Sequence, residues 1–136
     1  LDVSNDPLYP FGFGLSYTSF SYSELSLSKK TISPLEQLQV KLTVTNSGNF
    51  DGEETVQLYT RDLVGSIARP VKELKGFKKL FLKKGESREI IFSLGVDDLR
   101  FYNNDLKYIY EPGDFKVFVG SNSRDVKEAE FTLTGK

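Results

Sequence analysis

Apolar and polar residues alternate along most of this chain after Phe20, and turn-forming residues interrupt the alternation roughly every 8 to 15 residues. The clearest stretch is 38–45, where Leu38, Val40, Leu42 and Val44 alternate with polar residues. This alternation predicts a strand with one buried and one solvent-facing side. Similar patterns predict further strands over 20–27, 54–62, 71–82, 88–94, 107–110, 115–119 and 126–133.

About seven or eight strands without an amphipathic helix predict an all-β fold. A single sheet would leave one apolar face uncovered, so two packed sheets are expected. The apolar set changes phase between Tyr22 and Leu25, which indicates a bulge or a change of partner within the strand 20–27. Gly76 is expected to mark a kink or bulge in the strand 71–82. A single helical turn, opened by Asp97, is predicted within 96–102.

The segment 7–20, called here the opening segment, fits neither a strand nor a helix pattern. Pro7 and Pro10 fix φ and lack a backbone donor, and Gly12 and Gly14 allow close backbone approach. We expect a rigid, irregular N-terminal wrap whose rings pack against another part of a longer chain, since a free linker would be polar. The rings proposed to make this inter-domain contact are Tyr9, Phe11, Phe13, Tyr17 and Phe20.

Composition narrows the range of functions. The chain has 136 residues, which suits one domain, and it contains no Cys, His or Trp. It therefore lacks thiolate nucleophiles and the residue used most often as a base near neutral pH. The net charge is −1 and no apolar run approaches the roughly 20 residues of a membrane-spanning helix. We expect neither a nucleic-acid nor a membrane partner, and the start at Leu1 without any Met indicates a fragment.

Candidate chemical motifs have simpler interpretations. The glycines of 12–14 lack the strand and helix that flank a phosphate-binding loop. Glu53 and Glu54 should point to opposite faces of a strand, while Asp97 and Asp98 are expected to cap a turn. The cluster 103–105 is more typical of a hairpin turn than of a calcium site. We therefore predict no catalytic, cofactor-binding or metal-binding residue in this chain.

Two surface features leave alternatives open. Residues 69–88 hold eight basic and two acidic residues, a net charge of +6. A solvated edge strand is favoured, because lysines discourage pairing between sheet edges. Docking on an acidic face of a missing domain is the main alternative, and nucleic acid is disfavoured. Exposed rings could also stack on sugars, although packing is the favoured role; the candidates are Tyr59, Tyr102, Tyr108, Tyr110 and Phe118.

Several short blocks, in order, carry a resemblance to a known family. They are the opening segment, Ala68-Arg69-Pro70-Val71-Lys72-Glu73-Leu74-Lys75-Gly76-Phe77, Glu111-Pro112-Gly113-Asp114-Phe115, Val119-Gly120-Ser121 and Ser123-Arg124-Asp125. Together they resemble the C-terminal fibronectin type III-like domain of family 3 glycoside hydrolases, which include β-glucosidases and β-xylosidases. The resemblance implies a fibronectin type III-like (immunoglobulin-like) sandwich over 20–136, joined through a junction segment 1–19 to a preceding catalytic domain.

The resemblance also implies a division of labour within a longer chain. The family's hydrolytic members are retaining enzymes, with an Asp nucleophile from an N-terminal barrel and a Glu acid/base from a following α/β domain. Neither domain is present here, so no catalytic residue transfers to this chain. We expect a non-catalytic accessory domain without cofactors, whose partners are the catalytic domains of a β-glucosidase-like parent, itself periplasmic or secreted. A carbohydrate-binding module, a protein-interaction β-sandwich and a small autonomous hydrolase are the alternatives.

Overall fold

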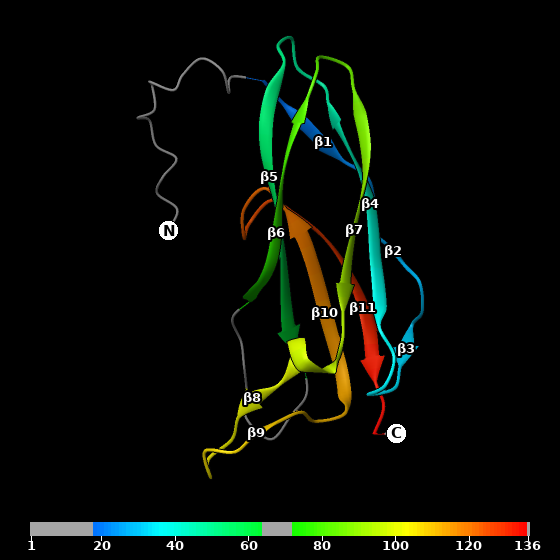
Figure 1. Cartoon of the computed structure of the whole chain (residues 1–136), viewed down its shortest axis with the longest axis vertical. Helices are drawn as coiled ribbons and strands as arrows, with labels where there is room; N and C mark the ends of the chain where they lie inside the picture. The colour runs from blue at the N-terminus through cyan, green and yellow to red at the C-terminus, as the bar shows by residue number, and fades with distance from the viewer. Residues whose placement is uncertain (1–17, 64–71, 136) are drawn as a thin grey trace.

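The computed structural model describes residues 18–63 and 72–135, which form two packed β-sheets and a small hairpin at one end (Figure 1). The predicted all-β sandwich is confirmed. The strands are β1 (Phe20–Tyr22), β2 (Ser26–Leu27), β3 (Thr31–Ile32), β4 (Leu38–Asn46), β5 (Gly52–Asp62), β6 (Glu73–Leu82), β7 (Ser87–Leu94), β8 (Phe101–Tyr102), β9 (Tyr108–Ile109), β10 (Gly113–Gly120) and β11 (Val126–Leu133).

The four-stranded sheet is built around β4, which pairs with β7 on one side and with β1 and β2 on the other. The register of β2 against β4 differs by one residue from that of β1. The backbone N–H of Ser23 still donates to the Thr43 carbonyl (2.9 Å), and the Ser23 hydroxyl accepts from the Thr43 N–H (2.8 Å). The predicted interruption of the strand 20–27 is therefore a bulge, in which a serine side chain replaces a missing backbone acceptor.

The five-stranded sheet has the order β3-β11-β10-β5-β6. Its pairs are antiparallel except for β3, whose two residues run parallel to the end of β11. The basic strand β6 lies at the edge of the sheet, as the pattern of lysines indicated. Its register shifts between Leu58 and Tyr59 of β5, which leaves Lys75 as an extra residue beside Gly76. The bulge predicted near Gly76 is confirmed.

Alternate residues of both sheets meet in one hydrophobic core. Val40 and Val44 of β4 are fully buried against this core, as are Val56 of β5, Val117 of β10 and Leu133 of β11. The rings of Phe115 and Phe131 stack there with centroids 5.5 Å apart. The alternation seen in the sequence therefore places one face of every long strand between the two sheets.

The connection between the sheets includes a 3₁₀ turn over Val96–Leu99 and the hairpin of β8 and β9 (Figure 1). The helical turn is confirmed, but Gly95 precedes it and the carboxylate of Asp98 accepts from the Gly95 N–H (2.9 Å). Asp98 rather than Asp97 therefore stabilises its start. The hairpin turn is also as predicted, since Asn103 Oδ1 accepts from two backbone N–H groups. Nowhere in 18–63 or 72–135 does a helix reach the length and apolarity needed to cross a membrane.

Candidate inter-domain site

Two residues near the end of the opening segment, Thr18 and Ser19, are hydrogen-bonded to the sandwich. The carbonyl of Ser19 accepts from the N–H groups of Ser47 (2.9 Å) and Gly48 (3.1 Å). The Thr18 hydroxyl donates to Asn46 Oδ1 (2.7 Å). We call this contact the joint and define it as Thr18, Ser19, Asn46, Ser47 and Gly48. The joint ties the start of the described chain to the turn between β4 and β5.

Asn46 is the centre of the joint, and its side chain is fully buried. Its Nδ2 group donates to the carbonyls of Phe50 (2.8 Å) and Leu82 (3.0 Å). Its Oδ1 atom accepts from Gly48 N–H (3.1 Å) as well as from Thr18. A buried amide is stable only when its donors and acceptors are paired, and here both ends are. Asn46 therefore connects the incoming chain, the β4–β5 turn and the end of β6.

Gly48 is required in the joint because of close backbone approach. A Cβ atom at this position would lie 2.2 Å from Thr18 Oγ1 and 2.5 Å from the Ser19 nitrogen. Such distances are too short for any side chain, so the segment 18–19 would have to move. The Asn46-x-Gly48 spacing thus creates a close-fitting seat for the incoming backbone.

Phe20 follows the joint directly and is the one predicted inter-domain ring that lies within the described residues. It begins β1, is half-buried and packs against the core. It also lines an open groove of about 530 Å³ together with Val119 of β10 and Val126 of β11. The other rings, Tyr9, Phe11, Phe13 and Tyr17, lie outside the described residues.

The adjacent carboxylates Glu53 and Glu54 do not converge on one site. Glu53 is exposed, whereas Glu54 accepts a hydrogen bond from the Tyr22 hydroxyl (2.8 Å) across the open side of the sandwich. Burial raises the pKa of Glu54, although hydrogen bonds from Tyr22 and from the Thr55 backbone oppose this. Burial also raises the pKa of Tyr22, helped by the nearby charge of Glu54. This pair is a structural contact between β1 and β5, since its carboxylate faces a phenol rather than a second acid.

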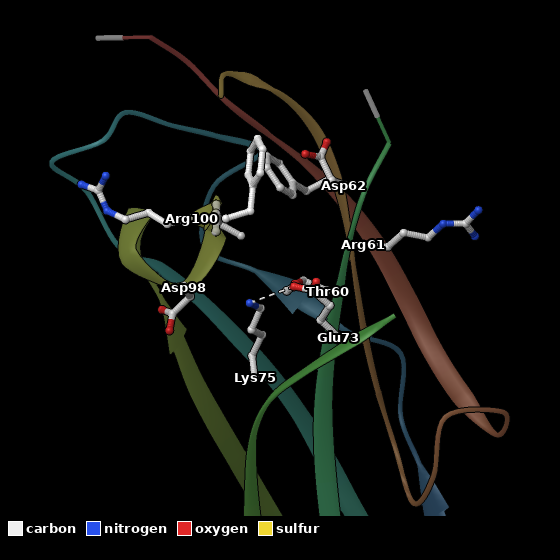
Figure 2. Close-up of a pocket in the computed structure, with 10 residues that line it drawn as sticks. Thr60, Arg61, Asp62, Glu73, Lys75, Asp98 and Arg100 are labelled. Carbon is white, nitrogen blue, oxygen red and sulfur yellow. Dashed lines mark ion pairs between the residues drawn. The ribbon is translucent and has the colours of Figure 1, made fainter. Parts of the chain in front are cut away.

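A small cavity lies between the end of β5, the start of β6 and the 3₁₀ turn (Figure 2). It holds about 20 Å³, enough for roughly one water molecule and far below the roughly 300 Å³ of a typical ligand pocket. Its one drawn ion pair joins Lys75 Nζ to Glu73 Oε1 (3.2 Å). Figure 2 shows Arg61 and Arg100 pointing away from the cavity in opposite directions. Within the described part of the chain, no group of three His, Cys, Asp or Glu residues could hold a metal ion.

The rings considered for sugar stacking have different environments. Tyr102 and Tyr108 of the β8–β9 hairpin are exposed and contact each other, with centroids 4.9 Å apart and planes tilted by 37°. Tyr110 is half-buried beneath Arg100, whose guanidinium lies 5.3 Å from the ring centre. Phe118, on the outer side of β10, is buried, with the Lys72 ammonium 4.8 Å from its ring centre. The structure therefore brings two exposed candidates together on the hairpin, and it places Tyr59 of β5 opposite Phe118 of β10.

A comparison with protein-family models matches residues 54–123 to the fibronectin type III-like domain. The chain belongs to that family. The matched residues run from β5 to the turn after β10. They include β5 and β6, which pair at the bulge, and the β8–β9 hairpin. The predicted identity of the fold is confirmed at the level of the family.

The relatives of this fibronectin type III-like domain are larger proteins. A periplasmic beta-glucosidase of Salmonella typhimurium is 44% identical over 132 residues, covering 97% of this chain and 17% of that protein. A beta-xylosidase of Formosa agariphila is 45% identical, covering 93% of this chain and 18% of that protein. A solved beta-glucosidase from Listeria innocua matches 99% of this chain and 19% of its own, with 42% identity and a TM-score of 0.82. The chain spans less than one-fifth of each, and the predicted resemblance to the domain of family 3 glycoside hydrolases is confirmed.

Sequence reasoning missed two parts of this domain's surface. Asn46 lies one residue beyond the predicted strand 38–45, yet it is the last residue of β4 and is buried. Its position in the alternation of 38–44 was the available signal, because it continues the buried set. The interpretation of 69–88 as a basic strand left Phe77 and Phe81 without a role. They lie on the face of β6 opposite to that of Leu80 and Leu82. A strand with apolar residues on both faces is typical of one that is covered on both sides.

Proposed function

We propose that this fibronectin type III-like domain is a non-catalytic accessory domain of a β-glucosidase-like family 3 glycoside hydrolase. Its role is to pack on the catalytic domains of the same parent chain and to stabilise them. The observation that carries the proposal is the joint, in which the incoming backbone is seated by a fully paired, buried asparagine. A domain on a loose tether would have no need for such a seat, because it would move independently.

The relatives support the same division of labour. They are named as beta-glucosidases and a beta-xylosidase, and each has more than four-fifths of its length outside the matched region. We propose that the parent of this domain is a retaining enzyme with β-glucosidase-like activity, and that it is periplasmic or secreted, as one relative is named. The domain by itself is expected to show no glycoside hydrolysis, because its carboxylates serve as caps, ion pairs and the Tyr22 contact.

The experiment compares the longer natural chain with a version that lacks residues 18–136. Thermal unfolding and hydrolysis of an aryl β-glucoside are measured for both, and the 136-residue chain is assayed separately. Loss of the domain should lower the midpoint of thermal unfolding and shorten the lifetime of activity on heating. Unchanged stability after removal, or turnover by the 136-residue chain, would contradict the proposal.

A second candidate, carbohydrate binding, is favoured by one observation, the exposed pair of Tyr102 and Tyr108. Aromatic faces of this kind stack on sugar rings in carbohydrate-binding modules. Titration of the 136-residue chain with a β-1,4-linked glucose oligomer, followed by tyrosine fluorescence, tests it. A saturable change that Tyr102→Ala abolishes would support this role, and no change at millimolar oligomer would exclude it.

A further inference from the structure

The outer face of the five-stranded sheet carries an apolar strip along its β6 side. Leu74, Phe77 and Phe81 of β6 are 53%, 60% and 50% exposed. In the sheet register, Leu74 lies opposite Tyr59 of β5, and Tyr59 lies opposite Phe118 of β10. We call these five residues the outer strip, whose exposed part is on β5 and β6, since Phe118 is buried. Large apolar side chains gathered on one face of a soluble domain are typical of an interaction site.

The outer face of the other sheet is different. There β4 and β7 present mainly polar side chains, which are bonded to one another across the strands. Gln39 Nε2 donates to Ser93 Oγ (2.9 Å), and the hydroxyls of Thr45 and Ser87 lie 2.7 Å apart. Ile91 is the exposed large apolar residue on this face. This face is suited to solvent, so the apolar character of the outer strip belongs to one side of the domain.

The free edge of β6 is poorly suited to adding a strand from a partner. Lys75 forms a bulge that breaks the regular spacing of backbone groups. Lys78 occupies an inward-facing position, with its ammonium 5.6 Å from the centre of the Phe92 ring. Bulges and inward-pointing charges are devices that prevent edge pairing. A partner would therefore contact the outer strip through side chains on the face of the sheet.

Charge and position indicate what that partner is. Lys79 lies between Phe77 and Phe81 on the same face, and Lys83 and Lys84 follow in the turn, all of them exposed. These three lysines outnumber Glu53, the exposed acid opposite Phe81 on the same face, and an excess of basic residues complements carboxylates on an opposing surface. The joint reaches the same end of β6, because Asn46 Nδ2 bonds the carbonyl of Leu82 (3.0 Å), which follows Phe81 directly. The joint is therefore bonded, through Asn46, to the residue next to Phe81 at one end of the outer strip.

We propose that the outer strip is the face through which this domain docks on the preceding part of its own longer chain, against an apolar surface rimmed with carboxylates. This inference rests on the proposed accessory function and specifies the surface that performs it. The polar face of β4 and β7 stays in solvent. The two faces therefore provide a test with an internal control.

The test uses cysteine labelling, since the chain contains no native cysteine. Phe77→Cys and, as the matched control on the other face, Ile91→Cys are made in the 136-residue chain and in the longer chain. Rates of alkylation at each site are followed by peptide mass spectrometry. Both sites should react rapidly in the 136-residue chain, because both side chains are exposed. In the longer chain Phe77→Cys should react at least tenfold more slowly, while Ile91→Cys keeps its rate.

Equal rates for Phe77→Cys in both chains, or equal slowing of both sites in the longer chain, would overturn the assignment of this face. A second pair of variants tests the charge. Lys79→Glu in the longer chain should restore labelling of Phe77→Cys several-fold, and Lys41→Glu on the polar face should not. The deletion and labelling experiments together distinguish the accessory function from the choice of docking face. If removal of 18–136 destabilises the longer chain but Phe77→Cys stays reactive, the accessory function holds and docking uses another surface.

Discussion

Replacing Asn46 by alanine is expected to lower the free energy of unfolding by about 4 kcal/mol. The substitution removes the side chain that pairs with the carbonyls of Phe50 and Leu82, with the Thr18 hydroxyl and with Gly48 N–H. Each of these four bonds contributes about 1 kcal/mol net, and groups left unpaired in a buried site make the loss larger. The carbonyl of Leu82 is the group at greatest risk, because its bond with Asn46 is buried.

Urea denaturation of the 136-residue chain, followed by circular dichroism, measures this change. The midpoint should fall while the slope m stays constant, since the surface exposed on unfolding is unchanged. Asn103→Ala is the control, because Asn103 also bonds backbone N–H groups but lies in the partly exposed hairpin turn. Its loss should be about 1 kcal/mol. Equal losses for the two asparagines would refute the view that the joint depends on a buried hub.

A double-mutant cycle with Thr18→Val tests whether the incoming chain is part of the same unit. Valine has nearly the shape of threonine and removes the hydroxyl that donates to Asn46 Oδ1. Thr18→Val alone should cost about 1 kcal/mol, and much less in the Asn46→Ala background. Strictly additive losses would show that Thr18 and Asn46 act independently.

Three further predictions concern other parts of the domain. Glu54→Gln should stabilise the chain, relative to the unsubstituted protein, progressively as the pH rises above 4.5, the ordinary pKa of a glutamate. The pKa of Glu54 is raised in the folded chain, so this residue contributes its full stability below pH 4.5 and loses that contribution as it ionises. Urea denaturation between about pH 4 and pH 7 measures the difference in stability, and a parallel pH dependence of both proteins would contradict the prediction. Leu106→Gly should stabilise by about 0.5–1 kcal/mol, because Leu106 is 80% exposed and has a φ of 61°; a lower midpoint of thermal unfolding would oppose this. Phe131→Ala should lower the free energy of unfolding by about 3–5 kcal/mol, because it removes the buried ring that stacks on Phe115. Urea denaturation measures the change, and a loss below about 1 kcal/mol would contradict the prediction.

The parts of the fold that were predictable are those in which local pattern and burial agree. The strand 38–46 could be recognised because each alternate residue from Leu38 to Val44 is apolar, and these residues face the core. The bulge after Tyr22 could be recognised because the apolar set shifts by one position there. The edge position of β6 could be predicted from its lysines, because lysines discourage pairing between sheet edges.

Other features depend on contacts that the local pattern does not record. Thr31 and Ile32 form β3, which pairs with β11 about a hundred residues later. Two residues are too short for a periodic signal, so only the distant partner defines this strand. The alternation of 38–44 indicates that Asn46 is buried, but it does not reveal the partners of its side chain, such as the carbonyl of Leu82 in β6.

The joint also has a consequence for building chimeric proteins. Thr18 and Ser19 precede the first strand, yet their hydrogen bonds belong to the sandwich. A crossover placed at residue 20 would leave Asn46 and Gly48 facing a foreign backbone. When this domain is exchanged between proteins, the chain should therefore be joined before Thr18, so that Thr18 and Ser19 stay with the Asn46 and Gly48 that they contact.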